Sequence, residues 1–178
     1  GSRAACDWRA PGLMAGATMP SMIRQDYVAN SNDSYWLTNA KAPMAAVSPI
    51  VGLTDIPQNL RTRSGIVEID ARLAGTDGLP GKGFDQAAVK TMLFWNKNHA
   101  AELFLDDTLK SCGTGGAVAL ADGKSVDLSQ ACAILAKWDR RMDNDSVGAL
   151  LWMEYWRQAQ KIADLYVAPF DVADPVHT

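Results

Sequence analysis

Histidine is scarce in this sequence, which contains only His99 and His177 among its 178 residues. A Ser–His–Asp or Cys–His site needs a histidine that takes the proton from the nucleophile. His177 is the penultimate residue, where rigid positioning is not expected. His99 begins a helical pattern, where a surface or capping role is the simpler interpretation. The residues themselves therefore give no support to a histidine-dependent hydrolase site.

Signals for metal, phosphate and nucleic-acid binding are also missing. No CxxC or HExxH pattern supplies zinc ligands. The glycines of residues 75–83 form no phosphate loop, because no Ser or Thr follows Lys82. Residues 143–146 begin like a calcium loop but lack its glycine and distal glutamate, so we expect a turn there. With a net charge of -3, the sequence predicts no cofactor, no metal and no nucleic-acid partner.

Long apolar runs are absent too. None approaches the roughly 18 residues of a membrane helix, and no signal peptide opens the chain. We therefore expect no membrane partner, and any export signal would lie upstream. The apolar share of 48% and the charged share of 21% are ordinary for a globular protein.

Three cysteines leave one without a partner in the chain. Cys112 and Cys132 bracket a glycine-rich stretch, and each lies at the edge of a helical pattern. In an oxidising compartment they could close a loop of about 20 residues. Two buried free thiols are the alternative, and Cys6 remains outside either arrangement.

Proline and glycine divide the chain into four segments. Residues 1–60, punctuated by several prolines, predict extended or irregular chain, with a short strand at residues 22–29. Residues 61–74 predict a short helix that carries an arginine pair, and residues 75–83 a linker. Residues 84–178 predict a helical segment. The fold class expected is α+β, mainly helical, with four to five helices and short strands.

Capping residues locate the helices of the last segment. Asp85 and Asn98 are each expected to cap one helix. Asp127, with Gln130 three residues later, resembles a capping box, and Ser146 is expected to cap a last helix that runs through residue 162. That last helix is expected to bury Leu150, Trp152, Met153, Trp156 and Ala159, and the final eight residues are expected to fray.

Residues 27–39 are unusually rich in side-chain amides, with Asn30, Asn32 and Asn39 beside Trp36. A buried amide needs several hydrogen-bond partners, so this is not a core strand. Asn and Asp tolerate left-handed backbone and bond their own main chain, so a turn is the simplest interpretation.

Several stretches resemble the large subunit of the penicillin acylase family, near the branch of acyl-homoserine lactone acylases and aculeacin A acylase. The principal match is Asn-Ser-Asn-Asp-Ser-Tyr-Trp-Leu-Thr-Asn at residues 30–39, followed by Leu-Arg-Thr-Arg at residues 60–63. Further matches, in the order of the family, lie at residues 1–8, 98–107 and 138–141.

The resemblance implies an N-terminal nucleophile hydrolase with an αββα fold, in which the first residue of the large subunit attacks an amide. The implied substrate is an N-acyl amide of the acyl-homoserine lactone, penicillin or lipopeptide type. The implied partners are the remainder of the large subunit and the small subunit of one precursor, in the periplasm or secreted by a bacterium. This setting favours the Cys112–Cys132 disulfide.

Site residues follow from the same resemblance. Asn32 matches the family's oxyanion-hole asparagine, with Asn30 as the alternative. Arg61 matches a buried arginine that orients the asparagine and the nucleophile's amine, with Arg63 as the alternative. Trp36 either holds the loop still or forms a wall of an acyl pocket.

The family's nucleophile has no match in this chain. Residues 1–3 resemble an internal stretch of the subunit, and Ile23 stands where this branch has a histidine. The sequence therefore predicts part of an acylase that is inactive alone. The alternative is a helical binding module in which the asparagine loop merely turns the chain.

Overall fold

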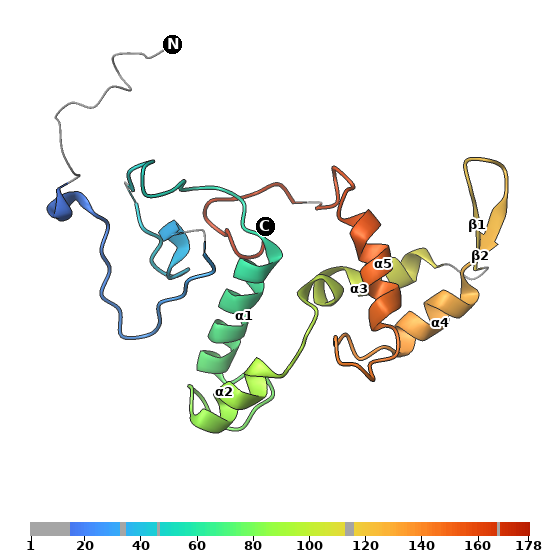
Figure 1. Cartoon of the computed structure of the whole chain (residues 1–178), viewed down its shortest axis with the longest axis horizontal. Helices are drawn as coiled ribbons and strands as arrows, with labels where there is room; N and C mark the ends of the chain where they lie inside the picture. Colours follow the sequence, from blue (N-terminus) through green and yellow to red (C-terminus); the bar gives the residue numbers. More distant parts are fainter. Residues whose placement is uncertain (1–14, 33–34, 46, 113–115, 167) are drawn as a thin grey trace, which may run out of the picture. The chain divides into compact units, whose positions relative to one another are not determined.

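The computed structural model describes residues 15–32, 35–45, 47–112, 116–166 and 168–178. The chain divides after Pro57 into two compact units (Figure 1). The mainly helical α+β architecture expected from the sequence is confirmed. Within the described residues, no helix is both long and apolar enough to cross a bilayer.

The first unit is irregular, as its prolines predict. Its described residues contain two short 3-10 helices, η2 (Gly16–Thr18) and η3 (Tyr35–Leu37). The strand predicted at residues 22–29 is wrong, because no strand forms there. Arg24 instead donates two hydrogen bonds to the carboxylate of Asp26, at 2.9 and 2.7 Å, and this local pair bends the chain.

The second unit begins with helix α1 (Leu60–Ala74). Asn59 accepts the Thr62 N–H at 2.9 Å, which satisfies one of the N–H groups that a helix start leaves unpaired. The helix predicted over residues 61–74 is thus present, with a start one residue earlier. Ile66 is buried on it.

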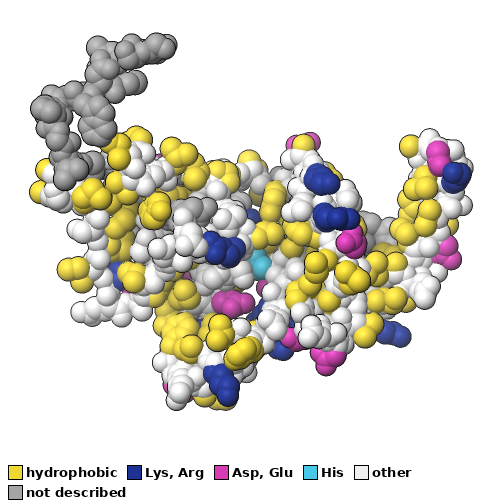
Figure 2. Space-filling view, in the orientation of Figure 1, with side chains coloured by type: hydrophobic (Ala, Val, Ile, Leu, Met, Phe, Trp, Pro, Cys, Tyr) yellow, Lys and Arg dark blue, Asp and Glu magenta, His cyan; other side chains and the backbone are white. Residues whose placement is uncertain are grey.

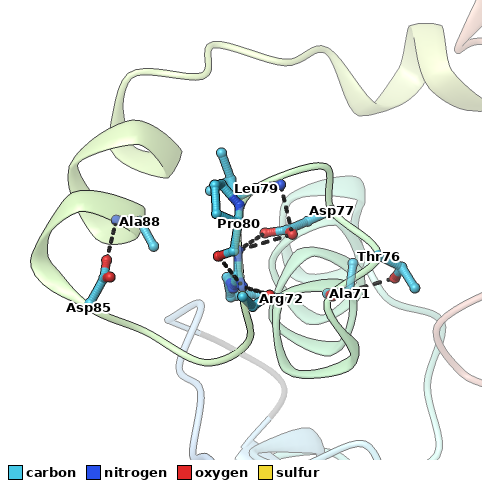
Figure 3. A network of polar contacts seen from close by, with 9 residues as sticks. Ala71, Arg72, Thr76, Asp77, Leu79, Pro80, Asp85 and Ala88 are labelled. Carbon is cyan, nitrogen blue, oxygen red and sulfur yellow. Dashed lines mark hydrogen bonds and ion pairs between the residues drawn. The ribbon is translucent and has the colours of Figure 1, made fainter.

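The glycine-rich residues 75–83 form an ordered loop that Arg72 ties to α1 (Figure 3). Arg72 is fully buried, and its guanidinium lies 3.0 Å from the Asp77 carboxylate. It also donates to the carbonyl oxygens of Pro80, at 3.1 Å, and Gly81. Residues 75–83 thus contain no helix or strand, and hydrogen bonds to one side chain hold them in place.

In the described part of this unit, four further helices and one hairpin follow. The helices are α2 (Gln86–Leu93), α3 (His99–Ser111), α4 (Ser129–Lys137) and α5 (Ala149–Ala159). Strands β1 (Ala117–Ala119) and β2 (Ser125–Asp127) pair antiparallel between α3 and α4, with Val118 opposite Val126.

Two of the four predicted helix caps are confirmed. Asp85 accepts the Ala88 N–H at 2.7 Å, and Asn98 accepts the Ala101 N–H at 3.0 Å. The prediction for Asp127 is met in part: its carboxylate accepts the N–H of Ser129, the first residue of α4, at 2.8 Å, but Asp127 ends β2 and Leu128 is the residue before the helix.

The prediction for Ser146 is wrong. Its hydroxyl accepts the Trp138 indole N–H at 3.0 Å and donates to Asp139, so it is not available to a helix end. Gly148 is the N-cap residue of α5 instead, with a φ of 116°. A Cβ there would lie 2.8 Å from the Trp138 Cβ, so this close approach requires glycine.

The core of the second unit lies among α3, α4 and α5. Its centre is aromatic: the Trp152 ring lies 5.8 Å from the Trp138 ring and 5.9 Å from the Trp156 ring. The buried members are Ala100, Ala101, Leu105, Leu135, Trp138, Ala149 and Trp152.

The broad buried face predicted for the last helix is narrower than expected. Trp152 and Ala159 are buried and Trp156 is partly buried, but Leu150 is 70% and Met153 50% exposed. Exposed apolar side chains also cover α2, on which no residue is buried (Figure 2). Helical spacing gives the apolar face of such a helix but not how much of it a neighbour covers.

The final residues of the chain pack against α1 and do not fray as predicted. Val176 is only 6% exposed, and its carbonyl oxygen accepts the Arg63 Nε–H at 2.5 Å. This bond joins residues 113 positions apart, a relation that no local pattern encodes.

A disulfide joins Cys112 at the end of α3 to Cys132 in α4, with the two Cα atoms 6.2 Å apart. The predicted pairing is therefore present in the structure. Cys6 lies outside the described residues.

We predict that thiol titration of the denatured, unreduced chain finds about one free thiol. Replacing Cys132 by Ser should lower the free energy of unfolding by about 3 kcal/mol, because the bond closes a loop of 20 residues in the unfolded chain. Three free thiols, or an unchanged urea midpoint for Cys132→Ser, would contradict this.

We also predict that Arg72→Met destabilises the chain by about 3–5 kcal/mol, because it leaves the Asp77 carboxylate buried without its ion pair. The control is Arg157→Met, which removes a solvent-exposed pair with Glu154 and should cost less than about 1 kcal/mol. Urea denaturation measures both, and equal effects would show that the loop does not depend on Arg72.

Candidate functional site

The base of the asparagine loop, residues 27–39, is closed by the side chain of Asn39. Asn39 is fully buried, and its amide donates to the Tyr27 carbonyl oxygen at 2.9 Å and to Asp26 at 3.2 Å. Its side-chain oxygen accepts the Lys41 N–H at 3.0 Å. A buried amide with three partners is fully compensated and fixes the two ends of the loop against each other.

Asp26 takes part in this closure as a charged group. Its hydrogen bonds to the Arg24 guanidinium hold the pKa of the carboxyl well below its usual range, and the Tyr27 N–H and Asn39 amide act in the same direction. The carboxylate that accepts from Asn39 is therefore ionised at neutral pH.

Main-chain bonds support the same base. The Ala29 N–H donates to the Thr38 carbonyl oxygen at 2.8 Å, and the Met44 N–H donates to the Trp36 carbonyl oxygen at 2.7 Å. The Tyr27 hydroxyl accepts the Ala40 N–H at 3.2 Å. The described ends of the loop are thus tied together at several levels.

Asn30 and Asn32 lie on the loop beyond this base. The Asn30 side-chain oxygen accepts the Asn32 N–H at 2.7 Å, which forms an Asx turn. Asn32 is exposed and has a φ of 70°, a left-handed conformation that asparagine tolerates better than most residues. The turn predicted here is therefore present, with Asn30 shaping the backbone and Asn32 presented to the surface.

Trp36 is only 1% exposed, and its indole N–H has no hydrogen-bond acceptor in the described part of the chain. The hollow of about 200 Å³ beside Asn30 is lined by Tyr35 and Thr38 but not by Trp36. Tyr35, which the sequence analysis did not select, packs its ring against Gly52, where a Cβ would lie 2.9 Å from it. A substrate contact for Trp36 stays a prediction.

The two candidate arginines lie in α1 of the second unit and have different surroundings. Arg61 is exposed in the first turn and lines an open groove of about 500 Å³ with Lys97 and His99. Arg63 is 4% exposed, and its guanidinium carbon lies 5.5 Å from the centre of the Tyr166 ring. Residues two apart on a helix do not face the same neighbour.

Asn32 belongs to the first unit and both arginines to the second. The predicted convergence of Asn32 with an arginine therefore stays a prediction.

Acidic side chains lie close to the groove of Arg61. His99 lies 3.2 Å from the Glu102 carboxylate, and this hydrogen bond lowers the pKa of Glu102. Burial raises the pKa of Glu68, partly offset by the charge of Lys97. Within the residues that the structure describes, no three His, Cys, Asp or Glu gather as metal ligands would.

Comparison with known proteins decides the family. Residues 1–174 match the family model described as penicillin amidase. The chain belongs to the penicillin amidase family.

Relatives within the penicillin amidase family match the whole chain. It is 42% identical over 184 residues to aculeacin-A acylase of Actinoplanes utahensis, covering 100% of this chain and 23% of that protein. It is 31% identical over 185 residues to acyl-homoserine lactone acylase PvdQ of Pseudomonas putida, and 29% identical over 186 residues to that of Pseudomonas syringae pv. syringae. Both matches cover 100% of this chain and 22% of the relative, so the chain spans less than a quarter of these curated relatives.

We predict that two glutamates beside the groove change the pH dependence of stability in opposite directions. The folded-state pKa of Glu68 is raised, so its ionisation destabilises the fold as the pH rises, and Glu68→Gln should be more stable than wild type at pH 7 but not at pH 3.5. The folded-state pKa of Glu102 is lowered, so its ionised form stabilises the fold at neutral pH, and this stabilisation is lost on acidification. Glu102→Gln should therefore be less stable than wild type at pH 7.

Urea midpoints of the three proteins at both pH values check this prediction. If both glutamine replacements stabilised the chain at pH 7, or both destabilised it, the prediction would be contradicted.

Proposed function

We propose that this chain is part of an acylase that hydrolyses the amide bond of an N-acyl substrate, with Asn32 as a donor to the oxyanion. Membership of the penicillin amidase family supports the class of reaction. The observation that carries the assignment is the exposed Asn32 on a loop closed by Asn39 and shaped by Asn30.

The chemistry of Asn32 suits this role. Amide hydrolysis places negative charge on the carbonyl oxygen as that carbon becomes tetrahedral. A side-chain amide donates a hydrogen bond to this charge and does not titrate. Because the loop is already fixed by its own hydrogen bonds, the donor requires little reorganisation when the charge develops.

Arg61 is the arginine that we assign to the site, although the family's arginine is buried and Arg61 is exposed in this chain. Arg63 is buried and already holds the Val176 carbonyl oxygen and the Tyr166 ring. Arg61 is exposed in the first turn of α1, where its permanently charged guanidinium can orient a polar group of the complete site. It is a positioning residue in this proposal.

The nucleophile lies elsewhere in the complete protein, which has the αββα fold of N-terminal nucleophile hydrolases. The substrate is an N-acyl amide of the acyl-homoserine lactone, penicillin or lipopeptide type. The names of two relatives, acyl-homoserine lactone acylase and aculeacin-A acylase, support this class. The Cys112–Cys132 disulfide supports a periplasmic or secreted location, since such bonds persist in oxidising compartments.

The test uses the complete enzyme. Asn32→Gly should lower kcat for amide cleavage by about two to three orders of magnitude, the usual cost of one oxyanion donor, with a much smaller change in KM. Glycine is chosen because it keeps the left-handed backbone without strain. Asn32→Ala should lower kcat by the same factor. It should also destabilise the loop, because alanine is strained in the left-handed backbone conformation of this residue.

If Asn32→Gly retained full turnover, the asparagine would serve only to turn the chain and the oxyanion assignment would be wrong. Arg61→Lys should also impair turnover, because an ammonium does not reproduce the guanidinium fork. Unchanged kinetics for Arg61→Lys would remove Arg61 from the site.

A further inference from the structure

A second concave feature lies wholly within the second unit, on the side of Arg63. It has a volume of about 450 Å³ and is walled by the side chains of α3, α5 and the final residues of the chain. Cavities of this size that are mainly apolar and hold a few polar groups are typical small-molecule sites. The members used below are Arg63, Phe104, Asp107, Trp156, Tyr166 and His177.

The wall of this cavity is a continuous row of flat groups. The Trp156 ring stacks on Phe104 with centroids 5.1 Å apart, and Phe104 meets the edge of Tyr166 at 5.3 Å. The Arg63 guanidinium then lies over Tyr166 at 5.5 Å. These contacts present an apolar surface that ends at one buried positive charge.

Arg63 uses only part of its hydrogen-bonding capacity. Its Nε–H donates to the Val176 carbonyl oxygen, and its two terminal nitrogens have no acceptor among the described residues. A guanidinium carries five donors. The terminal nitrogens of Arg63 are not among the buried atoms of the described chain that lack a partner, so they border the cavity, where an anion can reach them.

The nearby carboxylates of the described chain do not supply that acceptor. Asp107 lines the cavity but pairs with Lys110 at 2.7 Å, and Asp174 pairs with His177 at 2.7 Å. Arg63 acts on Asp174 only through a longer-range charge interaction. These two side-chain carboxylates thus have other partners, and the terminal nitrogens of Arg63 face the cavity.

We propose that this cavity binds the carboxylate of a small organic acid that has an apolar body. The carboxylate accepts from the two terminal nitrogens of Arg63, the geometry in which arginine binds planar anions. The apolar body lies against the Phe104 and Trp156 rings. This site involves neither Asn32 nor Arg61, the two residues that the proposed acylase chemistry uses.

The experiment uses 3-phenylpropionate as the probe and 3-phenylpropanamide as its uncharged isostere. Isothermal titration of this chain should show that the acid binds at least tenfold more tightly than the amide, because only the acid is a charge-assisted partner of Arg63. Arg63→Met should remove this preference. The affinity for the acid should fall by about tenfold to a hundredfold, and the affinity for the amide should stay nearly unchanged.

The matched control is Arg157→Met, which removes a neighbouring arginine that is exposed and paired with Glu154. It should bind both probes as wild type does. Equal affinity of the wild-type chain for acid and amide would overturn the proposal, and this result does not depend on how well the Arg63 variant folds.

The complete protein gives the second arm of the test. Retention of the preference for the acid there supports a free organic acid as the ligand. Loss of binding in the complete protein would overturn the proposal and assign the Arg63 acceptor to an acidic side chain elsewhere in the polypeptide.

Discussion

One side-chain oxygen, Asn98 Oδ1, organises the helices of the second unit. It accepts the Ala101 N–H at 3.0 Å and so starts α3, and it also accepts the indole N–H of Trp152 at 3.1 Å. Trp152 is completely buried at the centre of the aromatic core, where an indole N–H requires a partner. The main-chain N–H of Asn98 donates to the Arg140 carbonyl oxygen at 2.9 Å. The start of one helix, the burial of another and the turn before it therefore depend on a single residue.

This constraint places the functional surfaces of the second unit. Because α3 begins at Asn98, His99 faces the groove of Arg61 while Phe104 lines the cavity beside Arg63. The helix α1 packs on α3, and the final residues of the chain hold it through Arg63. Two arginines separated by one residue are thus given different tasks: one is buried and bonded to main chain, and the other remains at the surface of a groove.

Local sequence signals predicted what depends on neighbours in the chain. The caps of Asp85 and Asn98 could be found because a cap and its partner are three residues apart, and the helix of Ile66 because its apolar residues recur at helical spacing. The prediction of a Ser146 cap was wrong because Trp138 competes for the Ser146 hydroxyl. The prediction that the final residues fray was wrong because Arg63, which bonds Val176, lies 113 positions away in the sequence. At the site, amide-rich composition indicated a turn, whereas the choice of Asn32 came from family resemblance. The buried closure by Asn39 and the role of Asn30 in the backbone turn required the structure, since the three amides are alike in sequence.

The central claim is that Asn32 stabilises the charge that develops in the transition state. The most direct measurement is the affinity of the complete enzyme for a phosphonate analogue of the tetrahedral intermediate, compared between wild type and Asn32→Gly. A true oxyanion donor binds the analogue more strongly than it binds substrate, so the loss in analogue affinity should match the loss in kcat/KM, about two to three orders of magnitude. An analogue that bound both proteins equally well would contradict the assignment of Asn32.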